Sequence, residues 1–156
     1  HSGQLNLFKN KPWVVTPDKA TDQNALEVIH QISLSLGCRW ISAEAEIHDE
    51  AVGLISHLPV FISSALLNTL SEDINPSLYS LAKSIASSGF ADTSRVGGGN
   101  PELGVAMAKF NKKNLMKSLL FYRHSLDLFE KYLLEENWDE LEKILVSTQK
   151  TRQYFI

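Results

Sequence analysis

The chain has 156 residues, of which 44% are hydrophobic and 21% charged, a mixture typical of one globular domain, or of one domain plus a fragment. Its 15 basic and 18 acidic residues give a formal net charge of −3, and the lack of a basic block argues against nucleic acid as a partner. No apolar run reaches the roughly 18 residues of a membrane span, and no signal peptide is visible. The single cysteine, Cys38, excludes a disulfide within the chain. These features predict a cytoplasmic protein with no membrane partner.

The first part of the chain has the pattern of a strand, a helix and a second strand. Residues 12–17 are β-formers bounded by prolines, and Asp22 can cap a helix that ends at Gly37. Residues 38–41 predict the second strand. A βαβ unit belongs to a larger parallel sheet that helices cover on both faces. We therefore expect residues 1–42 to be the C-terminal remnant of a Rossmann-type α/β domain.

Helices are predicted from there onwards. One helix should begin at Ser42 with a capping box and continue to about residue 69, with a kink at Pro59, because proline lacks an N–H and its ring crowds the preceding turn. A second helix should run over residues 76–87 and stop at Gly89. Residues 90–100 predict an irregular segment.

The remainder of the chain predicts long helices. Asn100 and Pro101 are a natural cap and first helical residue, and neither glycine nor proline occurs after Gly104. Asn137 predicts the cap of a last helix. The sequence thus predicts a mainly α fold, in which residues 43–156 form a helical dimerisation bundle. Its apolar seam, spaced by fours and threes, consists of Leu115, Leu119, Tyr122, Leu126, Phe129 and Leu133.

The first candidate site lies on the helix around His57. Asp49 and Gly53 share a stripe of this helix, Gly53 would let another backbone come close, and Pro59 frees a carbonyl near His57. The alternative is a surface histidine or a hydrogen-bonded core histidine. His48 and His57 lie on opposite faces and no i, i+4 pair of ligands exists, so we expect no metal site.

The second candidate site is the segment that holds Arg95. A guanidinium offers a planar set of donors suited to a carboxylate, and glycines 97–99 would let the backbone approach a ligand. Asp92 could orient Arg95 through an ion pair, or merely cap the loop. The alternatives are a surface arginine and a phosphate cradle; the latter is disfavoured because no strand precedes the glycines, which are expected to form a tight turn.

Together these motifs resemble the prephenate and arogenate dehydrogenase family over nearly the whole chain. The matching segments are Asn6-Leu7-Phe8 with residues 11–17, His48-Asp49 with residues 56–59, and residues 90–103. The last of these has a form associated with arogenate-type members. The resemblance implies an oxidative decarboxylation in tyrosine biosynthesis, in which a nicotinamide accepts a hydride, carbon dioxide leaves and the ring becomes aromatic.

The resemblance also implies roles for individual parts of the chain. Arg95 would hold a substrate carboxylate, with His57 in the pocket and Asp92 nearby, and residues 43–156 would form a homodimer. NAD or NADP would be bound mainly by a preceding domain, since the glycine-rich fingerprint and the family's catalytic histidine are missing here. No catalytic residue is therefore expected in this chain, which by itself should be inactive.

Two other interpretations remain open. A non-enzymatic helical dimerisation or scaffold module would explain the seam. It would not explain why Asp92, Arg95 and three glycines occur together in one segment. The helical half of another hydroxyacid dehydrogenase would share the architecture. Such domains usually carry a catalytic lysine, and residues 47–58 contain no lysine.

Overall fold

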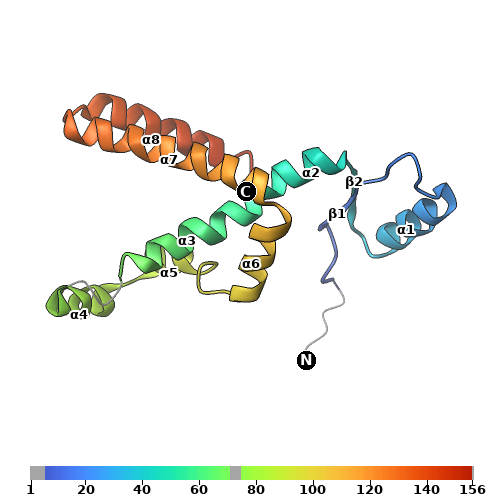
Figure 1. The fold of residues 1–156 in the computed structure, drawn as a ribbon, viewed down its shortest axis with the longest axis horizontal. Coiled ribbons are helices and arrows are strands. Elements are labelled where there is room, and N and C mark those ends of the chain that lie inside the picture. The colour runs from blue at the N-terminus through green and yellow to red at the C-terminus, as the bar shows by residue number, and fades with distance from the viewer. Residues whose placement is uncertain (1–5, 71–74, 156) are drawn as a thin grey trace.

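The computed structural model describes residues 6–70 and 75–155 and shows a mainly helical chain of extended arms that meet near the middle (Figure 1). The predicted fold class, a helical part preceded by a small remnant of a parallel sheet, is confirmed. The elements are β1 (Pro12–Val15), α1 (Gln23–Ser35), β2 (Arg39–Ser42), α2 (Ala45–Val52), the π-helix η1 (Gly53–His57), α3 (Leu58–Asn68), α4 (Pro76–Ile85), α5 (Ser88–Ser94), α6 (Pro101–Phe110), α7 (Lys112–Leu134) and α8 (Trp138–Arg152).

The βαβ unit forms as the sequence predicts. Strands β1 and β2 pair in parallel, with Trp13 opposite Trp40, and α1 makes the crossover. The Asp22 carboxylate caps α1 by accepting two backbone N–H groups, and Gly37 ends it with a φ of 73°, which a glycine adopts without strain. A two-stranded parallel sheet is not stable alone. The unit is therefore expected to be part of a larger sheet.

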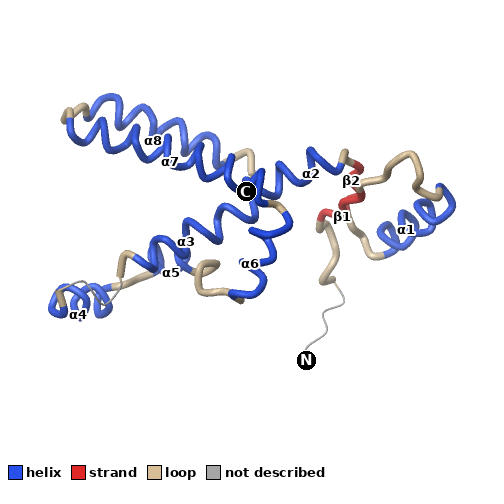
Figure 2. The backbone as a smooth tube through the Cα atoms, in the orientation of Figure 1, coloured by secondary structure: helices blue, strands red, loops and turns tan. Residues whose placement is uncertain are grey.

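The central helix is continuous from α2 through η1 to α3 (Figure 2). It does not begin at Ser42, which ends β2; Glu44 occupies the N-cap position and makes no side-chain cap. The distortion expected near Pro59 takes the form of a π-helix, in which Leu58 N–H reaches back five residues to the Gly53 carbonyl. Because Pro59 cannot donate to Ile55, this wider turn accommodates its ring.

This helix is long and apolar enough to cross a membrane, judged by length and composition alone. It spans Ala45–Asn68, with a mean hydropathy of 1.5 over its most apolar 18 residues. The sequence prediction that no run reaches this length is therefore wrong, because the serines, the histidine and the asparagine after Glu50 carry no formal charge. Only 17% of that window is buried within the chain. A helix at the core of an oligomer meets the same criteria, so this is weak support for a membrane span.

The segment that leads to Arg95 differs from the prediction. Helix α4 ends at Ile85, and a separate helix, α5, covers Ser88–Ser94. Gly89 lies inside α5 and does not stop a helix. Asp92 is consequently helical, and Arg95 directly follows the last residue of α5. The break comes instead from the extended backbone at Ser87, whose φ and ψ are −132° and −166°.

The last three helices are capped largely as predicted. Asn100 accepts the N–H groups of two residues in the first turn of α6, and Asn137 caps α8. The absence of glycine and proline after Gly104 nevertheless does not give an unbroken helix, because the chain turns at Asn111, with φ −127° and ψ 35°. Helices α7 and α8 then form the hairpin seen in Figure 2.

The buried core of the described residues is small, with one part where α7 begins against the central helix and another just before β2. The apolar residues buried within the chain are Cys38, Leu58 and Leu115. Large apolar side chains elsewhere are exposed, among them Phe110 at 87%, Phe121 at 55% and Ile85 at 69%. So much uncovered apolar surface is typical of a subunit that is completed by a partner.

Candidate functional site

His57 lies in the π-helix, where it is held by a side chain from another element. Asn111, at the break between α6 and α7, places its amide Nδ2 2.6 Å from the Asp49 carbonyl oxygen and 3.3 Å from His57 Nδ1. Asn114 Nδ2 donates to Asn111 Oδ1 over 2.8 Å. His57 is half-buried and Asn111 is buried. The histidine is therefore held in an ordered polar cluster.

Gly53 lets this cluster form. A Cβ at Gly53 would lie 3.1 Å from Asn114 Cβ, tighter than ordinary van der Waals contact, and 3.5 Å from Asn111 Nδ2. The prediction that Gly53 allows another backbone to come close is confirmed, because the backbone carbon of Asn114 lies 3.4 Å from that position. The start of α7 can thus approach the π-helix closely.

The segment around Arg95 is fastened to the same central helix by Ser63, which is 2% exposed. Ser63 Oγ donates to the Thr93 carbonyl over 2.8 Å and accepts the Gly97 N–H over 2.8 Å. Ser64 Oγ donates to the Gly97 carbonyl over 3.3 Å. The backbone is thus bonded on both sides of Arg95, whose own side chain is exposed.

The three glycines after Arg95 lie in the tight turn that we expected, with the Gly97 N–H bonded to the Ser94 carbonyl and the Gly99 N–H to the Val96 carbonyl. Among the described glycines, only Gly37 has a positive φ. Gly97 is required for a different reason: a Cβ there would lie 2.5 Å from both the Ser63 backbone carbon and the Ser64 backbone nitrogen. The need for glycine is steric, and it is strongest at Gly97.

Asp92 and Arg95 are near in sequence but do not form an ion pair, which was one of the two roles considered for Asp92. The ion pairs of the described residues include neither side chain. Within the described residues, no hydrogen bond joins Arg95 and His57. What connects them is the central helix, since Ser63 follows His57 by six residues, a rise of about 9 Å.

Comparison with known proteins identifies the family. The family model described as "Prephenate dehydrogenase, dimerization domain" matches residues 44–147. The chain belongs to this family. Its members are oxidoreductases of tyrosine biosynthesis, so the resemblance inferred from the three motifs is confirmed.

Several relatives match nearly the whole chain. Prephenate dehydrogenase of Bacillus subtilis is 25% identical over 135 residues, which is 86% of this chain and 36% of that protein. Cyclohexadienyl dehydrogenase of Zymomonas mobilis is 28% identical over 97% of this chain and 51% of its own length. The chain therefore spans about half, or less, of the length of these relatives.

Solved structures of the family have the same fold. Synechocystis arogenate dehydrogenase is 42% identical with a TM-score of 0.88, covering 97% of this chain and 54% of that one. Prephenate dehydrogenase of Aquifex aeolicus, in complex with hydroxyphenyl propionate and NAD+, is 26% identical with a TM-score of 0.88, covering 97% and 52%.

Sequence reasoning missed Asn111, Asn114 and Ser63. A polar Asn-Lys-Lys-Asn run at residues 111–114 interrupts an apolar pattern, and that interruption is the signal that could have identified the helix break. The serine pair at 63–64 sits within an apolar helix, where small hydroxyl residues permit close approach of another backbone. Neither signal identifies the partner on another element.

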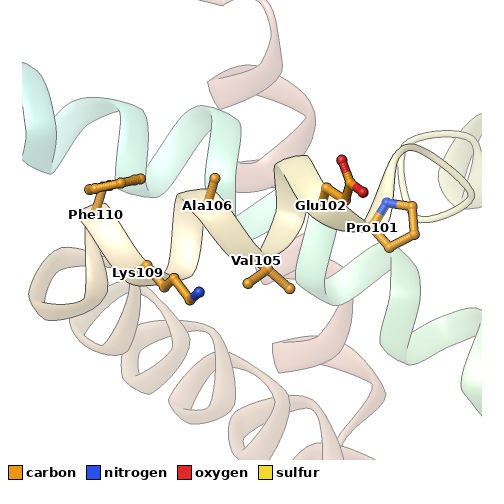
Figure 3. A pocket seen from close by; sticks show the side chains of 6 residues that line it. All are labelled: Pro101, Glu102, Val105, Ala106, Lys109 and Phe110. Carbon is orange, nitrogen blue, oxygen red and sulfur yellow. The ribbon is translucent and has the colours of Figure 1, made fainter.

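A hollow along α6 is separate from both candidate positions. Figure 3 shows its lining, which comes from α6 alone: Pro101, Glu102, Val105, Ala106, Lys109 and Phe110. None of His57, Asp92 and Arg95 contributes to it. Among the described residues, no group of three histidine, cysteine, aspartate or glutamate side chains could hold a metal ion.

Proposed function

We propose that this chain is the substrate-binding and dimer-forming part of an NAD(P)-dependent arogenate or prephenate dehydrogenase. The match of residues 44–147 to the family's dimerization domain carries the proposal. In it, residues 1–42 end the dinucleotide-binding domain and residues 43–156 form the helical domain. We further take the enzyme to be soluble and cytoplasmic, with the largely apolar central helix as part of a dimer core.

Arg95 and His57 supply the substrate contacts in this proposal. Arogenate and prephenate both carry carboxylates, and an arginine can bond a carboxylate through two parallel N–H groups. The backbone bonds from Ser63 on either side of Arg95 favour a fixed position for the base of this side chain. The higher identity to the arogenate dehydrogenase, 42% against 26% for the Aquifex enzyme, favours arogenate as the substrate.

The cofactor would be bound mainly outside this chain. A pyrophosphate site needs a glycine-rich turn between a strand and a helix, and the connection from β1 to α1, residues 16–22, contains no glycine. The NAD+ of the Aquifex complex supports a nicotinamide cofactor for the complete enzyme. When bound, the cofactor would accept the hydride, while the residues of this chain bind and orient the substrate.

The complete enzyme tests the proposed activity. We expect it to reduce NAD+ or NADP+ with arogenate, and less efficiently with prephenate, as followed by nicotinamide absorbance and carbon dioxide release. Failure to oxidise either substrate by a folded enzyme would contradict the proposal and favour the scaffold interpretation.

The isolated 156-residue chain should neither bind a nicotinamide cofactor nor oxidise either substrate. The physical reason is the missing pyrophosphate site. Calorimetric titration with NAD+ and NADP+, alongside the activity assay, checks both points, and the complete enzyme is the positive control. Turnover by the chain in a preparation free of complete enzyme would contradict this prediction.

The chain should also form a homodimer. In the predicted seam, Leu126 remains 47% exposed and Leu119, Tyr122 and Phe129 are only partly covered, so the hairpin does not bury the seam by itself. The flanking Phe121 is exposed as well. Each such side chain buried by a partner contributes roughly 1.5–3 kcal/mol. Sedimentation equilibrium should give twice the chain mass, and a compact monomer at high concentration would show this prediction to be wrong.

A further inference from the structure

Asn111 is a buried polar residue whose partners fix its orientation. Its amide nitrogen lies against the Asp49 carbonyl at 2.6 Å, and its Oδ1 accepts from Asn114 at 2.8 Å. A carbonyl oxygen can only accept. Turning the amide over would place two oxygens against each other at Asp49, so the NH2 group must be the one that faces Asp49.

This orientation decides what His57 can present to Asn111. The NH2 group has two N–H bonds, of which one goes to Asp49 and the other is available to His57 Nδ1, 3.3 Å away. A proton on Nδ1 would point at that N–H. Nδ1 is therefore an acceptor without a proton, and the neutral ring carries its hydrogen on Nε2.

We propose that Asn111 is a positioning residue that holds His57 in the Nε2–H tautomer, so that His57 donates a hydrogen bond to a substrate oxygen. The part that concerns substrate rests on the function proposed above. In this tautomer Nε2 has no lone pair in the ring plane, so the free edge of His57 acts as a donor and not as a general base.

The surrounding fold supports a rigid arrangement. The Asp49 carbonyl also accepts the Gly53 N–H along the helix, so Asn111 bonds to a carbonyl whose position is already set. Gly53 has no side chain, so Asn111 and Asn114 can pack closely against the helix at this point. The π-helix places His57 at the end of this group, beside the break between α6 and α7.

The tautomer can be measured in the complete enzyme labelled with 15N at histidine. Two-bond 15N–1H correlation spectra distinguish Nε2–H from Nδ1–H rings, and the loss of one set of signals in His57→Gln assigns them. We expect His57 to be the Nε2–H tautomer in the wild type, a mixture in Asn111→Ala, and the wild-type tautomer in Asn114→Ala, which keeps the bond to Nδ1. A wild-type Nδ1–H ring, or an unchanged spectrum in Asn111→Ala, would overturn the proposal.

Kinetics separates this inference from the proposed function. Asn111→Ala should raise KM by about fivefold, the effect of one weakened neutral hydrogen bond, with a wild-type melting curve showing that the fold is intact. If the tautomer shifts while KM and kcat do not change, Asn111 positions His57 but His57 does not contact substrate, and that part of the proposed function fails. If Asn111→Ala does not fold, the tautomer of His57 in the wild type is the test: an Nε2–H ring supports the proposal and an Nδ1–H ring overturns it.

Discussion

Replacing Arg95 by alanine in the complete enzyme should raise KM about tenfold to a hundredfold and leave kcat near its wild-type value. A charge-assisted hydrogen bond to a carboxylate is worth roughly 1.5–3 kcal/mol, and a contact that is equal in the ground and transition states affects KM alone. Steady-state kinetics with arogenate or prephenate as the varied substrate measures both constants.

Two further variants make the Arg95 experiment specific. Arg95→Lys should recover only part of the loss, because an ammonium cannot form the two parallel bonds of a guanidinium. Arg123, exposed on α7, provides the matched control, and Arg123→Ala should leave KM unchanged. If Arg95→Ala is folded and kinetically normal, Arg95 is an ordinary surface arginine.

Gly97→Ala should damage the same function without touching Arg95. Its new Cβ would overlap the backbone between Ser63 and Ser64 at 2.5 Å, and backbone cannot move aside as a flexible side chain can. The segment must shift, which breaks both hydrogen bonds of Ser63. We expect a loss of stability of about 1–3 kcal/mol, visible as a lower Tm, and a KM increase approaching that of Arg95→Ala.

The same substitution at Gly89 is the control. Gly89 lies in α5, only a few residues from Arg95, and a Cβ there meets no atom within 4 Å. Gly89→Ala should therefore keep KM and raise stability by about 0.5–1 kcal/mol, because alanine is the better helix former. Equal effects of Gly89→Ala and Gly97→Ala would show that the close contact with Ser63 is unimportant.

The features that the sequence predicted correctly depend on neighbouring residues. Asp22, Asn100 and Asn137 cap helices within three residues of themselves, and Gly37 ends α1 through its own backbone conformation. The βαβ unit likewise depends on two short β-forming runs and the helix between them. Such signals are contained in a few consecutive residues and need no knowledge of the rest of the fold.

The features that the sequence did not predict depend on contacts between distant residues. Asn111 breaks a helix that its local sequence favours, and its side chain bonds to Asp49, 62 residues earlier. Gly97 was expected to let the backbone approach a ligand, but what lies against it is Ser63, 34 residues away. To predict the role of either residue, one would have to know which helix packs alongside it.

The π-helix has a geometric consequence for how one helix serves two neighbours. Each residue of a regular α-helix advances around the axis by about 100°, so an unbroken helix would put Asp49 and Ser63 on nearly the same side, within about 40°. The wider turn at Gly53–His57 takes up one extra residue, so every residue after it is rotated about the helix axis by about 100° relative to an unbroken helix. The earlier half therefore faces α7 while the later half faces the segment that carries Arg95. In this helix the angular offset between the two contact faces is set by the one extra residue that the wider turn takes up.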